Sequence, residues 1–356
     1  MKRGVITGWG KCVPPAVLSN ADLETVTETS DDWITTRTGI KERRISHVEV
    51  SDLAALAGKR AMAAAGVGPA DLDMIVLATC TPDRLIPSAA AVVQEKIGAI
   101  GIPAIDLNAA CSGFVYGITV ADQMIRTGAM RRVLVIGAEK LSTWLDFTRR
   151  DTAVLFGDGA GAVVLEASEE DAGILAFDLG ADGSAGDLLC VPNTGTAPAI
   201  DDRGLPYISM QGADVFRRAV KAMGDASARV VEGAGLTVAD VDLLIPHQAN
   251  VRIIDATARR LDLDPAQVYV NIASYGNTSA ATIPIALTEA LEEGRVKPGD
   301  HIVFAAFGGG FTWGAVLYRW GSRTEPLGTT DAELPPSDAT ALELLQRNVD
   351  LYGKGI

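Results

Sequence analysis

The chain is poor in several residue types that define common protein classes. Its 356 residues include only four cysteines and three histidines, and aromatic residues make up 5% of the total. Cys12, Cys80, Cys111 and Cys190 are widely spaced and form no C-x-x-C pair, which argues against a disulfide framework and against a zinc site. We therefore expect free thiols, no bound metal and a reducing, cytoplasmic compartment.

Long apolar runs and positive charge are also missing. No apolar run reaches the length of about 18 residues that a membrane span requires. Residues 1–7 read as a strand and lack the longer apolar segment and cleavage site of a secretory signal. The net charge is −14, from 45 acidic and 31 basic residues, and this charge would repel a nucleic acid. We expect neither a membrane nor a nucleic-acid partner.

Small residues and short apolar segments dominate what remains. Hydrophobic residues make up 48% of the chain, and there are 37 glycines. Continuous apolar runs at 74–79 and 133–137 predict buried strands, and the strand-like run at 102–107 predicts a further strand. The alanine- and leucine-rich segment 52–65 has helical periodicity and precedes Gly66, a plausible helix end. This alternation of buried strands and helices predicts an α/β fold.

The order of these elements repeats along the chain. Residues 70–76 are echoed by residues 239–245, a shift of 239 − 70 = 169 positions. Residues 156–164 are echoed, with altered loops, by 307–317. So long a period excludes a solenoid and indicates two similar halves, 1–170 and 171–320. Residues 321–336 then predict a linker and 339–351 a short helix, so that 321–356 form a tail outside the repeat.

The segment 108–114 is the first candidate for chemistry. It places Cys111 between the predicted strand 102–107 and an amphipathic run that ends near Arg126. A cysteine at or near a helix start faces unpartnered N–H groups and the positive end of the helix dipole, which both favour the nucleophilic thiolate. The alternative is a small buried cysteine that only packs.

Two residues of the second half could join Cys111. His247 ends the apolar strand 243–246, and sites in α/β folds gather at the carboxyl ends of strands. Asn277 lies in the small, polar stretch 274–280, and it follows Cys111 by 277 − 111 = 166 residues, near the position that the repeat pairs with Cys111. We predict that the three meet where the halves join. The alternative is a hydrogen-bonded core histidine and a helix cap.

These motifs resemble those of the thiolase-fold condensing enzymes, and specifically the β-ketoacyl-acyl-carrier-protein synthase III family. The resemblance covers about residues 1–320. Its Cys-His-Asn set differs from the Cys-His-His set of the elongating ketosynthases. The matching stretches occur in the family's order: Trp33-Ile34-x-x-Arg37-Thr38-Gly39-Ile40, Ala109-Ala110-Cys111-Ser112-Gly113-Phe114, Phe156-Gly157-Asp158-Gly159-Ala160-Gly161, His247-Gln248-Ala249-Asn250, Gly276-Asn277-Thr278-Ser279 and Phe307-Gly308-Gly309-Gly310-Phe311-Thr312-Trp313-Gly314.

The resemblance implies a fold and a reaction. The fold is thiolase-like, with two βαβαβαββ halves forming a five-layered αβαβα core, and the family is homodimeric. The reaction is the decarboxylative Claisen condensation that starts type II fatty-acid synthesis. Cys111 would take the acyl group from acyl-CoA. His247 and Asn277 would stabilise the enolate formed when malonyl-acyl carrier protein (ACP) loses carbon dioxide. The backbone N–H groups of Cys111 and Gly309 would hold the later oxyanion. No cofactor is implied, because acyl-CoA is a substrate.

The same resemblance implies roles in substrate binding. Trp33 and Arg150 would sandwich the adenine of CoA, Arg37 would meet its phosphates, and Asn250 would bond the pantetheine arm. Arg149 adjoins Arg150, and the spacing from Phe156 favours Arg150.

The acyl pocket would be lined by Phe156, by Phe307 and by Ile86 of the partner subunit. Many acetyl-preferring members have phenylalanine where Ile86 stands, so we predict tolerance of branched or medium-length acyl chains. Because both proteins are acidic, ACP docking needs a local basic patch, for which the family's positions correspond to Arg217, Arg252, Arg259 and Arg260.

Three other functions stay open at this point. The chain could prime a polyketide or another secondary product with the same residues. It could transfer the acyl group to an alcohol or amine without decarboxylation, although His247 and Asn277 argue against this. It could also be a non-enzymatic acyl-binding subunit, which would have no need of all three residues.

Overall fold

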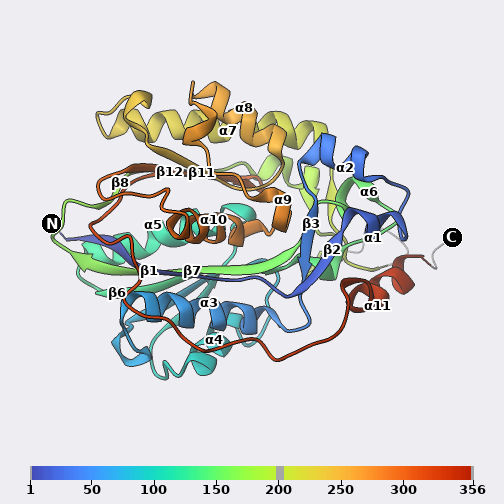
Figure 1. Cartoon of the computed structure of the whole chain (residues 1–356), viewed down its shortest axis with the longest axis horizontal. Coiled ribbons are helices and arrows are strands. Elements are labelled where there is room, and N and C mark those ends of the chain that lie inside the picture. The colour runs from blue at the N-terminus through green and yellow to red at the C-terminus, as the bar shows by residue number, and fades with distance from the viewer. Residues whose placement is uncertain (1, 198–203, 354–356) are drawn as a thin grey trace.

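Two β-sheets and their helices form five layers in the computed structural model, which describes residues 2–197 and 204–353. Met1 and residues 354–356, which belong to the predicted first and last segments, lie outside the described residues. Helices α7 and α8 cover one outer face, α3 and α4 cover the other, and α5 and α10 lie between the sheets (Figure 1). The predicted αβαβα order is therefore confirmed.

The first sheet has the strand order β1-β7-β6-β4-β5. Its strands β4, β5 and β6 are parallel, whereas β7 is antiparallel to both of its neighbours. Every residue of β4 is buried, as expected for a strand covered on both faces by helices. The bounds are β1 (Arg3–Cys12), β4 (Met74–Ala78), β5 (Ala104–Leu107), β6 (Arg132–Lys140), β7 (Asp158–Ser168), α3 (Val50–Ala65), α4 (Ala89–Ile97) and α5 (Gly113–Arg126).

The second sheet repeats this plan in the order β11-β12-β13-β8. The pair β11 and β12 is parallel, and β13 is antiparallel to both of its neighbours. The chain passes from the first sheet to the second between Ser168 and Gly173. The bounds are β8 (Gly173–Ala181), β11 (Leu243–Pro246), β12 (His301–Gly308), β13 (Thr312–Arg319), α7 (Gly212–Gly233), α8 (Val251–Arg260) and α10 (Thr282–Glu292).

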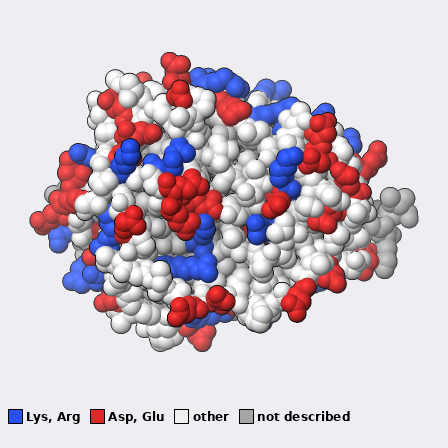
Figure 2. Space-filling view, viewed as in Figure 1, with Lys and Arg blue, Asp and Glu red and all other residues white. Residues whose placement is uncertain are grey.

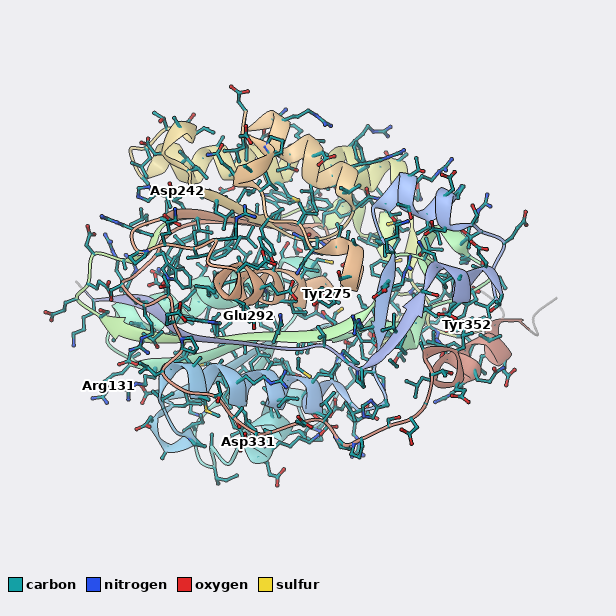
Figure 3. The ribbon with its side chains drawn as sticks, viewed as in Figure 1. Arg131, Asp242, Tyr275, Glu292, Asp331 and Tyr352 are labelled. Carbon is teal, nitrogen blue, oxygen red and sulfur yellow. The ribbon has the colours of Figure 1, made fainter. Side chains whose placement is uncertain are left out.

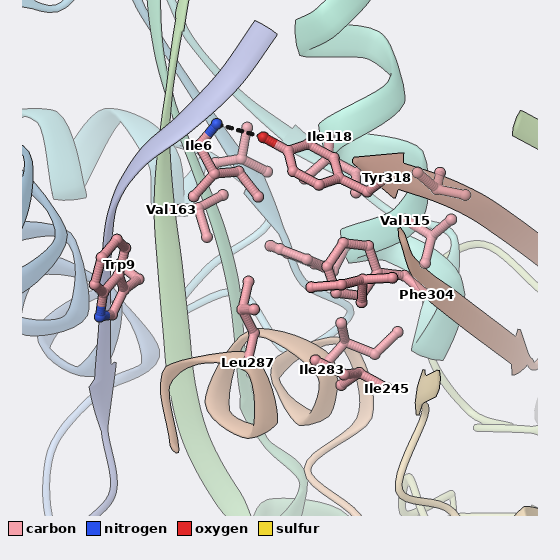
Figure 4. Packing of buried hydrophobic residues seen from close by; sticks show 14 of the residues in the cluster. Ile6, Trp9, Val115, Ile118, Val163, Ile245, Ile283, Leu287, Phe304 and Tyr318 are labelled. Atoms are coloured by element: carbon pink, nitrogen blue, oxygen red, sulfur yellow. Dashed lines mark hydrogen bonds between the residues drawn. The ribbon is translucent and has the colours of Figure 1, made fainter. Parts of the chain in front are cut away.

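An apolar core fills the layer between the two sheets. Phe304, Val115 and Leu287 pack there from three different elements (Figure 4). The backbone N–H of Ile6 donates to the buried hydroxyl of Tyr318 at 2.6 Å, which ties β1 to β13. This bond satisfies the one polar atom that the Tyr318 ring brings into the core.

Shorter elements surround the ends of the sheets and frame the site described below. They are β2 (Ala16–Ser19), β3 (Glu42–Ile45), β9 (Leu189–Cys190), β10 (Ser209–Met210), α1 (Asn20–Glu24), α2 (Asp31–Thr38), α6 (Arg150–Ala153) and α9 (Ile272–Tyr275), together with the 3₁₀ turns η2 (Ala110–Ser112) and η7 (Ser279–Ala281).

The tail after β13 follows the outside of the first half and ends in helix α11 (Ala341–Gly353), beside β2 (Figure 1). The predicted linker lacks regular structure but still packs, since the N–H of Leu327 donates to the carbonyl of Ala64 at 2.9 Å. The Asn348 amide donates to the carbonyls of Ser142, Thr143 and Leu145 at 2.8–3.3 Å. Tyr352, labelled in Figure 3, donates its hydroxyl to the carbonyl of Pro206.

Charged side chains are mixed on the surface. On the face shown in Figure 2, acidic and basic groups are interspersed. No helix in the described ranges has the length and apolar character needed to cross a bilayer.

Candidate active site

One cavity of about 660 Å³ collects residues from both halves of the chain. Cys111 reaches it from the first half, and His247 and Asn277 reach it from the second. The three side chains that we predicted to converge therefore line a common space.

The Cys111 turn is held from two sides. Cys111 is the central residue of η2, directly before α5, and Ala110 has a positive φ of 47°. The N–H of Ala110 donates to the Asn108 side chain at 3.2 Å. From the second half, Gly308 comes so close that a Cβ atom there would lie 2.6 Å from the Cys111 nitrogen. Only glycine permits this approach.

Cys111 is a thiol in the resting structure. Its pKa is raised to about 12, chiefly by burial and also by the nearby charge of Glu139, while interaction with the Ser279 hydroxyl and a backbone N–H lowers it. The helix start was predicted to favour the thiolate; the backbone N–H does lower the pKa, but desolvation outweighs it and the net shift is upward. The proton must therefore leave during the reaction.

His247 follows β11 and is 1% exposed. Burial lowers its pKa to about 3, so the imidazole is neutral at physiological pH. Its Nδ1 lies 2.7 Å from the hydroxyl oxygen of Thr282, which also lies 2.9 Å from the carbonyl oxygen of Ser279. The Thr282 hydroxyl has one proton, which it donates either to the Ser279 carbonyl or to Nδ1. In the first arrangement Nδ1 carries the ring proton and donates to Thr282, and in the second Nε2 carries the ring proton and is a donor.

Asn277 is oriented through its carbonyl end. Its Oδ1 accepts from the N–H of Ser279 at 2.8 Å, so the NH₂ group is the end left to donate elsewhere. Its backbone bonds to residues of the first half, since its N–H donates to Leu155 at 2.8 Å and its carbonyl accepts from Gly157 at 3.1 Å. Asn277 is thus fixed to both halves.

The two turns at the cavity are pseudo-symmetric copies. Ser279 has a φ of 51°, close to the 47° of Ala110, and the shift is 279 − 110 = 169 residues. The bond from Ser279 to Asn277 repeats the bond from Ala110 to Asn108. Asn277 is therefore the counterpart of Asn108, and the true counterpart of Cys111 is Ala280, three positions beyond the one we had paired with it.

The predicted nucleotide-binding residues gather at Trp33. The guanidinium carbons of Arg37 and Arg150 lie 4.7 and 4.9 Å from the centre of the Trp33 ring. Arg149 instead lies over Tyr207 at 4.4 Å. Trp33, Arg37 and Asn250 line the cavity. The choice of Arg150 over Arg149 thus agrees with the geometry, although Arg150 itself does not line the cavity.

The predicted acyl-pocket residues separate into two groups. Phe156, Phe307 and Gly309 line the cavity. Ile86 does not line the cavity of its own chain; it is 88% exposed, next to Leu85 at 83%.

The predicted docking arginines lie on α7 and α8 and are exposed. Arg252 also lines the cavity. Arg217 pairs with Asp214 and Arg260 with Asp225, which lowers the charge that they offer to a partner. The structure gives no ion pair to Arg252 or Arg259 within the residues it describes.

Three residues near Cys111 were missed as functional candidates. Cys80 and Ser279 line the cavity, and Glu139 lies buried behind them, at the carboxyl end of β6. An acidic residue that continues the apolar run 133–137 was the signal that could have revealed Glu139.

A cysteine thiol, a neutral imidazole and a carboxamide at the junction of two pseudo-symmetric α/β halves define a condensing enzyme of the thiolase fold. No cluster of three or more metal-ligating side chains occurs in the described part of the chain.

Comparisons with known proteins place this chain within that class. Residues 105–183 match the family model described as 3-oxoacyl-[acyl-carrier-protein (ACP)] synthase III, and residues 231–320 match the model of its C-terminal region. The chain is 52% identical to β-ketoacyl-[acyl-carrier-protein] synthase III 2 of Vibrio vulnificus, over 97% of this chain and 96% of the relative. It is 51% identical to the synthase III of Geobacillus kaustophilus, over 90% of this chain and all of the relative. The crystal structure of the Aquifex aeolicus synthase III has a TM-score of 0.85 and 50% identity, covering 89% of this chain and all of that one.

The chain therefore belongs to the β-ketoacyl-acyl-carrier-protein synthase III family, and the resemblance found in the sequence is confirmed. The Geobacillus relative leaves about a tenth of this chain unmatched, whereas the match to the Vibrio relative covers nearly all of it.

Proposed function

We propose that this enzyme condenses an acyl-CoA starter with malonyl-ACP to give 3-oxoacyl-ACP, CoA and carbon dioxide, as the first condensation of type II fatty-acid synthesis. The observation that supports it most strongly is the shared cavity of Cys111, His247 and Asn277. The reaction needs a nucleophile for the acyl group and neutral donors for an enolate, and these three residues supply both. The proposal requires no cofactor.

The acylation step uses Cys111. Its sulfur attacks the thioester carbonyl of acyl-CoA, and the oxyanion that forms is held by the backbone N–H groups of Cys111 and Gly309. Trp33, with Arg150 stacked on it, takes the adenine, Arg37 takes a phosphate and Asn250 bonds the pantetheine arm. The indole and guanidinium faces, 4.9 Å apart at present, must separate to admit a base.

The condensation step uses His247 and Asn277. Loss of carbon dioxide from malonyl-ACP leaves an enolate, whose oxygen accepts from His247 Nε2–H and from the Asn277 amide. Each preorganised donor of this kind contributes about 3–4 kcal/mol. The enolate carbon then attacks the acyl-Cys111 carbonyl. The low pKa of His247 keeps it a neutral donor and makes it a weak base.

We also propose a homodimer. Strand β5 is at the edge of the first sheet, and its Ile105 is 41% exposed. Ile86 and Leu85 are large apolar side chains with no cover in one chain. Such an edge and such side chains are typical of an interface. In the dimer Ile86 would enter the partner's acyl pocket.

ACP would dock beside the cavity mouth. Arg252 lines the cavity, and Arg259 lies on the same helix, two turns away. These two exposed cations, with Arg217 and Arg260 as weaker contributors, offer an acidic carrier a local attraction that the net charge of −14 does not. The reaction takes place in the cytoplasm, where four free cysteines stay reduced.

The test is an assay of purified enzyme with acetyl-, isobutyryl- and octanoyl-CoA, each mixed with malonyl-ACP. The proposal predicts carbon dioxide release and a 3-oxoacyl-ACP product, with turnover of branched or medium starters beside acetyl. Acyl transfer to another acceptor with no carbon dioxide release would contradict it. Turnover restricted to a carrier protein of polyketide synthesis would replace fatty-acid synthesis with the alternative pathway.

A further inference from the structure

A buried carboxylate lies behind the catalytic cysteine, and the condensation mechanism above gives it no task. Glu139 is fully buried, and it accepts from the Thr81 hydroxyl at 2.6 Å and from the Cys80 N–H at 3.2 Å. The Thr79 hydroxyl and the Cys80 thiol add weaker contacts at 3.3 Å. All of these partners are donors, which fits an ionised carboxylate because only that form accepts from every side.

Ser279 connects this carboxylate to Cys111. Its hydroxyl donates its one proton to Glu139 Oε1 at 3.1 Å, and Ser279 and Cys111 line the same cavity from the adjoining turns η7 and η2, where the Ser279 hydroxyl lowers the pKa of the Cys111 thiol. Ser279 is 1% exposed, and its φ of 51° is unusual for a residue with a side chain. The hydroxyl thus lies between a thiol that must lose a proton and a carboxylate that can take one.

Strand β6 of the first half contacts the turn that contains Ser279 and holds it in place. A Cβ atom at Gly137, two residues before Glu139, would lie 2.2 Å from the Ala280 carbonyl oxygen. The turn η7 therefore presses directly on β6. This contact brings Ser279 of the second half onto Glu139 of the first.

We propose that Ser279 and Glu139 form a proton relay for Cys111. This proposal rests on the proposed function for the identity of the acyl donor. As the Cys111 sulfur bonds to the thioester carbon of acyl-CoA, the thiol proton moves to Ser279 Oγ, and the Ser279 hydroxyl proton moves to Glu139. When the tetrahedral intermediate breaks its bond to CoA, the proton returns along the same path to the departing CoA thiolate. The products are acyl-Cys111 and CoA-SH, and no net charge is created.

A comparison of the two candidate bases supports this assignment. Burial lowers the pKa of His247 to about 3, whereas burial raises the pKa of the Glu139 carboxyl. A group with a pKa nearer to neutrality is the better acceptor at physiological pH. Two tasks are thereby divided, since Glu139 takes the proton during acylation and His247 donates during condensation.

The test distinguishes a proton relay from a simple effect of nearby charge, because the two predict opposite changes in the rate of Cys111 alkylation when Glu139 is replaced. The variant Glu139→Gln keeps the shape and removes the negative charge. If Glu139 acts only as a charge, its loss lowers the Cys111 pKa and speeds alkylation by iodoacetamide at neutral pH. If Glu139 is the base, alkylation slows, and the single-turnover rate of Cys111 acylation by acetyl-CoA falls by about 10²–10⁴-fold.

Three further variants complete the design. Ser279→Ala should slow acylation while leaving the other bonds to Glu139 intact, and it tests the relay even if Glu139→Gln fails to fold. Glu139→Asp should recover part of the rate. Asp122→Asn removes a buried carboxylate at the far end of α5, which accepts from the Gly4 N–H at 2.8 Å, and should change stability without slowing acylation.

The readout also includes the second half-reaction. Pre-acylated Glu139→Gln enzyme should consume malonyl-ACP at nearly the normal rate. Faster alkylation, or an equal loss in both half-reactions, would overturn the relay. If iodoacetamide alkylates the wild-type Cys111 normally but no acyl-CoA acylates it, the proposed function is overturned instead. Failure of the relay and failure of the proposed function can therefore be told apart.

Discussion

The two halves of this protein carry the same turn at the same place and use it differently. In the first half, Asn108 accepts from Ala110 and the turn presents Cys111. In the second, Asn277 accepts from Ser279, and the position of the cysteine is taken by Ala280. Asn108 is exposed and Asn277 is 6% exposed. One backbone plan thus presents our proposed nucleophile, Cys111, in one copy and our proposed enolate donor, Asn277, in the other.

The halves also differ at their edges. The first sheet has the additional strand β5, whereas in the second sheet the corresponding edge of β11 has only a bridge from Leu244 to Val268. The exposed edge that we assign to the dimer therefore belongs to the half that carries the nucleophile. The outer edge of the other half is covered by its own loops. The two sheets therefore share a strand plan and differ in how their outer edges are covered.

The largest effect should come from the nucleophile. Cys111→Ala should abolish acylation and condensation, with a loss of at least about 10⁴-fold, because no other group in the cavity is placed to replace it. Intact-protein mass spectrometry after mixing with acetyl-CoA should show no added acetyl mass. Acetylation of the variant at Cys80 or Cys190, the other two cysteines that line the cavity, would show that another thiol can replace Cys111.

The same substitution at the two equivalent asparagines, Asn277 and Asn108, should slow condensation to different extents. Asn277→Ala should slow condensation by about 10²–10³-fold, because it removes a donor to the enolate. Asn108→Ala should cost about 1 kcal/mol of stability through the lost bond to Ala110, with a much smaller kinetic effect. The measurement is the rate at which pre-acylated enzyme consumes malonyl-ACP. Equal kinetic losses would break the contrast between the halves.

The tautomer of His247 should depend on Thr282. Thr282→Val keeps the volume and removes the hydroxyl that bonds to Nδ1 and selects the ring tautomer, so condensation should slow by up to about 10²-fold. Acylation should change little, since our relay does not use His247. Thr282→Ser, which restores a hydroxyl, is the matched control and should recover most of the rate. Failure of this recovery would mean that Thr282 acts through packing alone.

Substitutions at Gly308 and Gly137 should show how tightly the two halves are packed at the site. Gly308 presses on η2, and Gly137 presses on η7. Gly308→Ala and Gly137→Ala should each lower the free energy of unfolding by about 1–3 kcal/mol through steric strain. Denaturant unfolding measures this effect. Gly308→Ala should also slow Cys111 acylation. Wild-type stability in both variants would mean that the halves are not in tight contact at the site.

The tail should affect stability and leave the kinetics unchanged. Asn348→Ala removes the donor shared by three carbonyls in residues 142–145 and should cost about 1–3 kcal/mol. Thermal unfolding should reveal it. The control is Gln346→Ala on the same helix, where the exposed side chain contacts only Asp350 at 3.1 Å. A similar loss in both variants would attribute the effect to helix propensity rather than to the Asn348 bonds.

Much of this account could be predicted from local patterns. The apolar runs predicted the buried strands, and the 169-residue shift predicted the two halves. Cys111 and His247 were found because each follows a strand, and Asn277 was found from its polar stretch and its spacing from Cys111. Features that depend on desolvation were not found. The helix start was predicted to favour the Cys111 thiolate, but desolvation raises the pKa of this thiol, and no sequence pattern shows that desolvation.

Contacts between the halves were equally invisible in the sequence. Glu139 and Ser279 are 279 − 139 = 140 residues apart, and only the pressing of η7 on β6 at Gly137 brings them together. The packing of the tail on residues 142–145 has no sequence signal either, because backbone carbonyls accept the bonds from Asn348. Such contacts arise from tertiary packing, so they cannot be predicted from the pattern of any single segment.

The central claim is that residues from two halves act on one acyl group. The most direct test is peptide mapping by mass spectrometry of enzyme quenched after acetyl-CoA is added, and again after malonyl-ACP follows. The account predicts an acetyl group on Cys111 that disappears as 3-oxobutanoyl-ACP forms in wild type and persists in Asn277→Ala. An unmodified Cys111, or an acetyl group that leaves equally fast from the Asn277 variant, would contradict it.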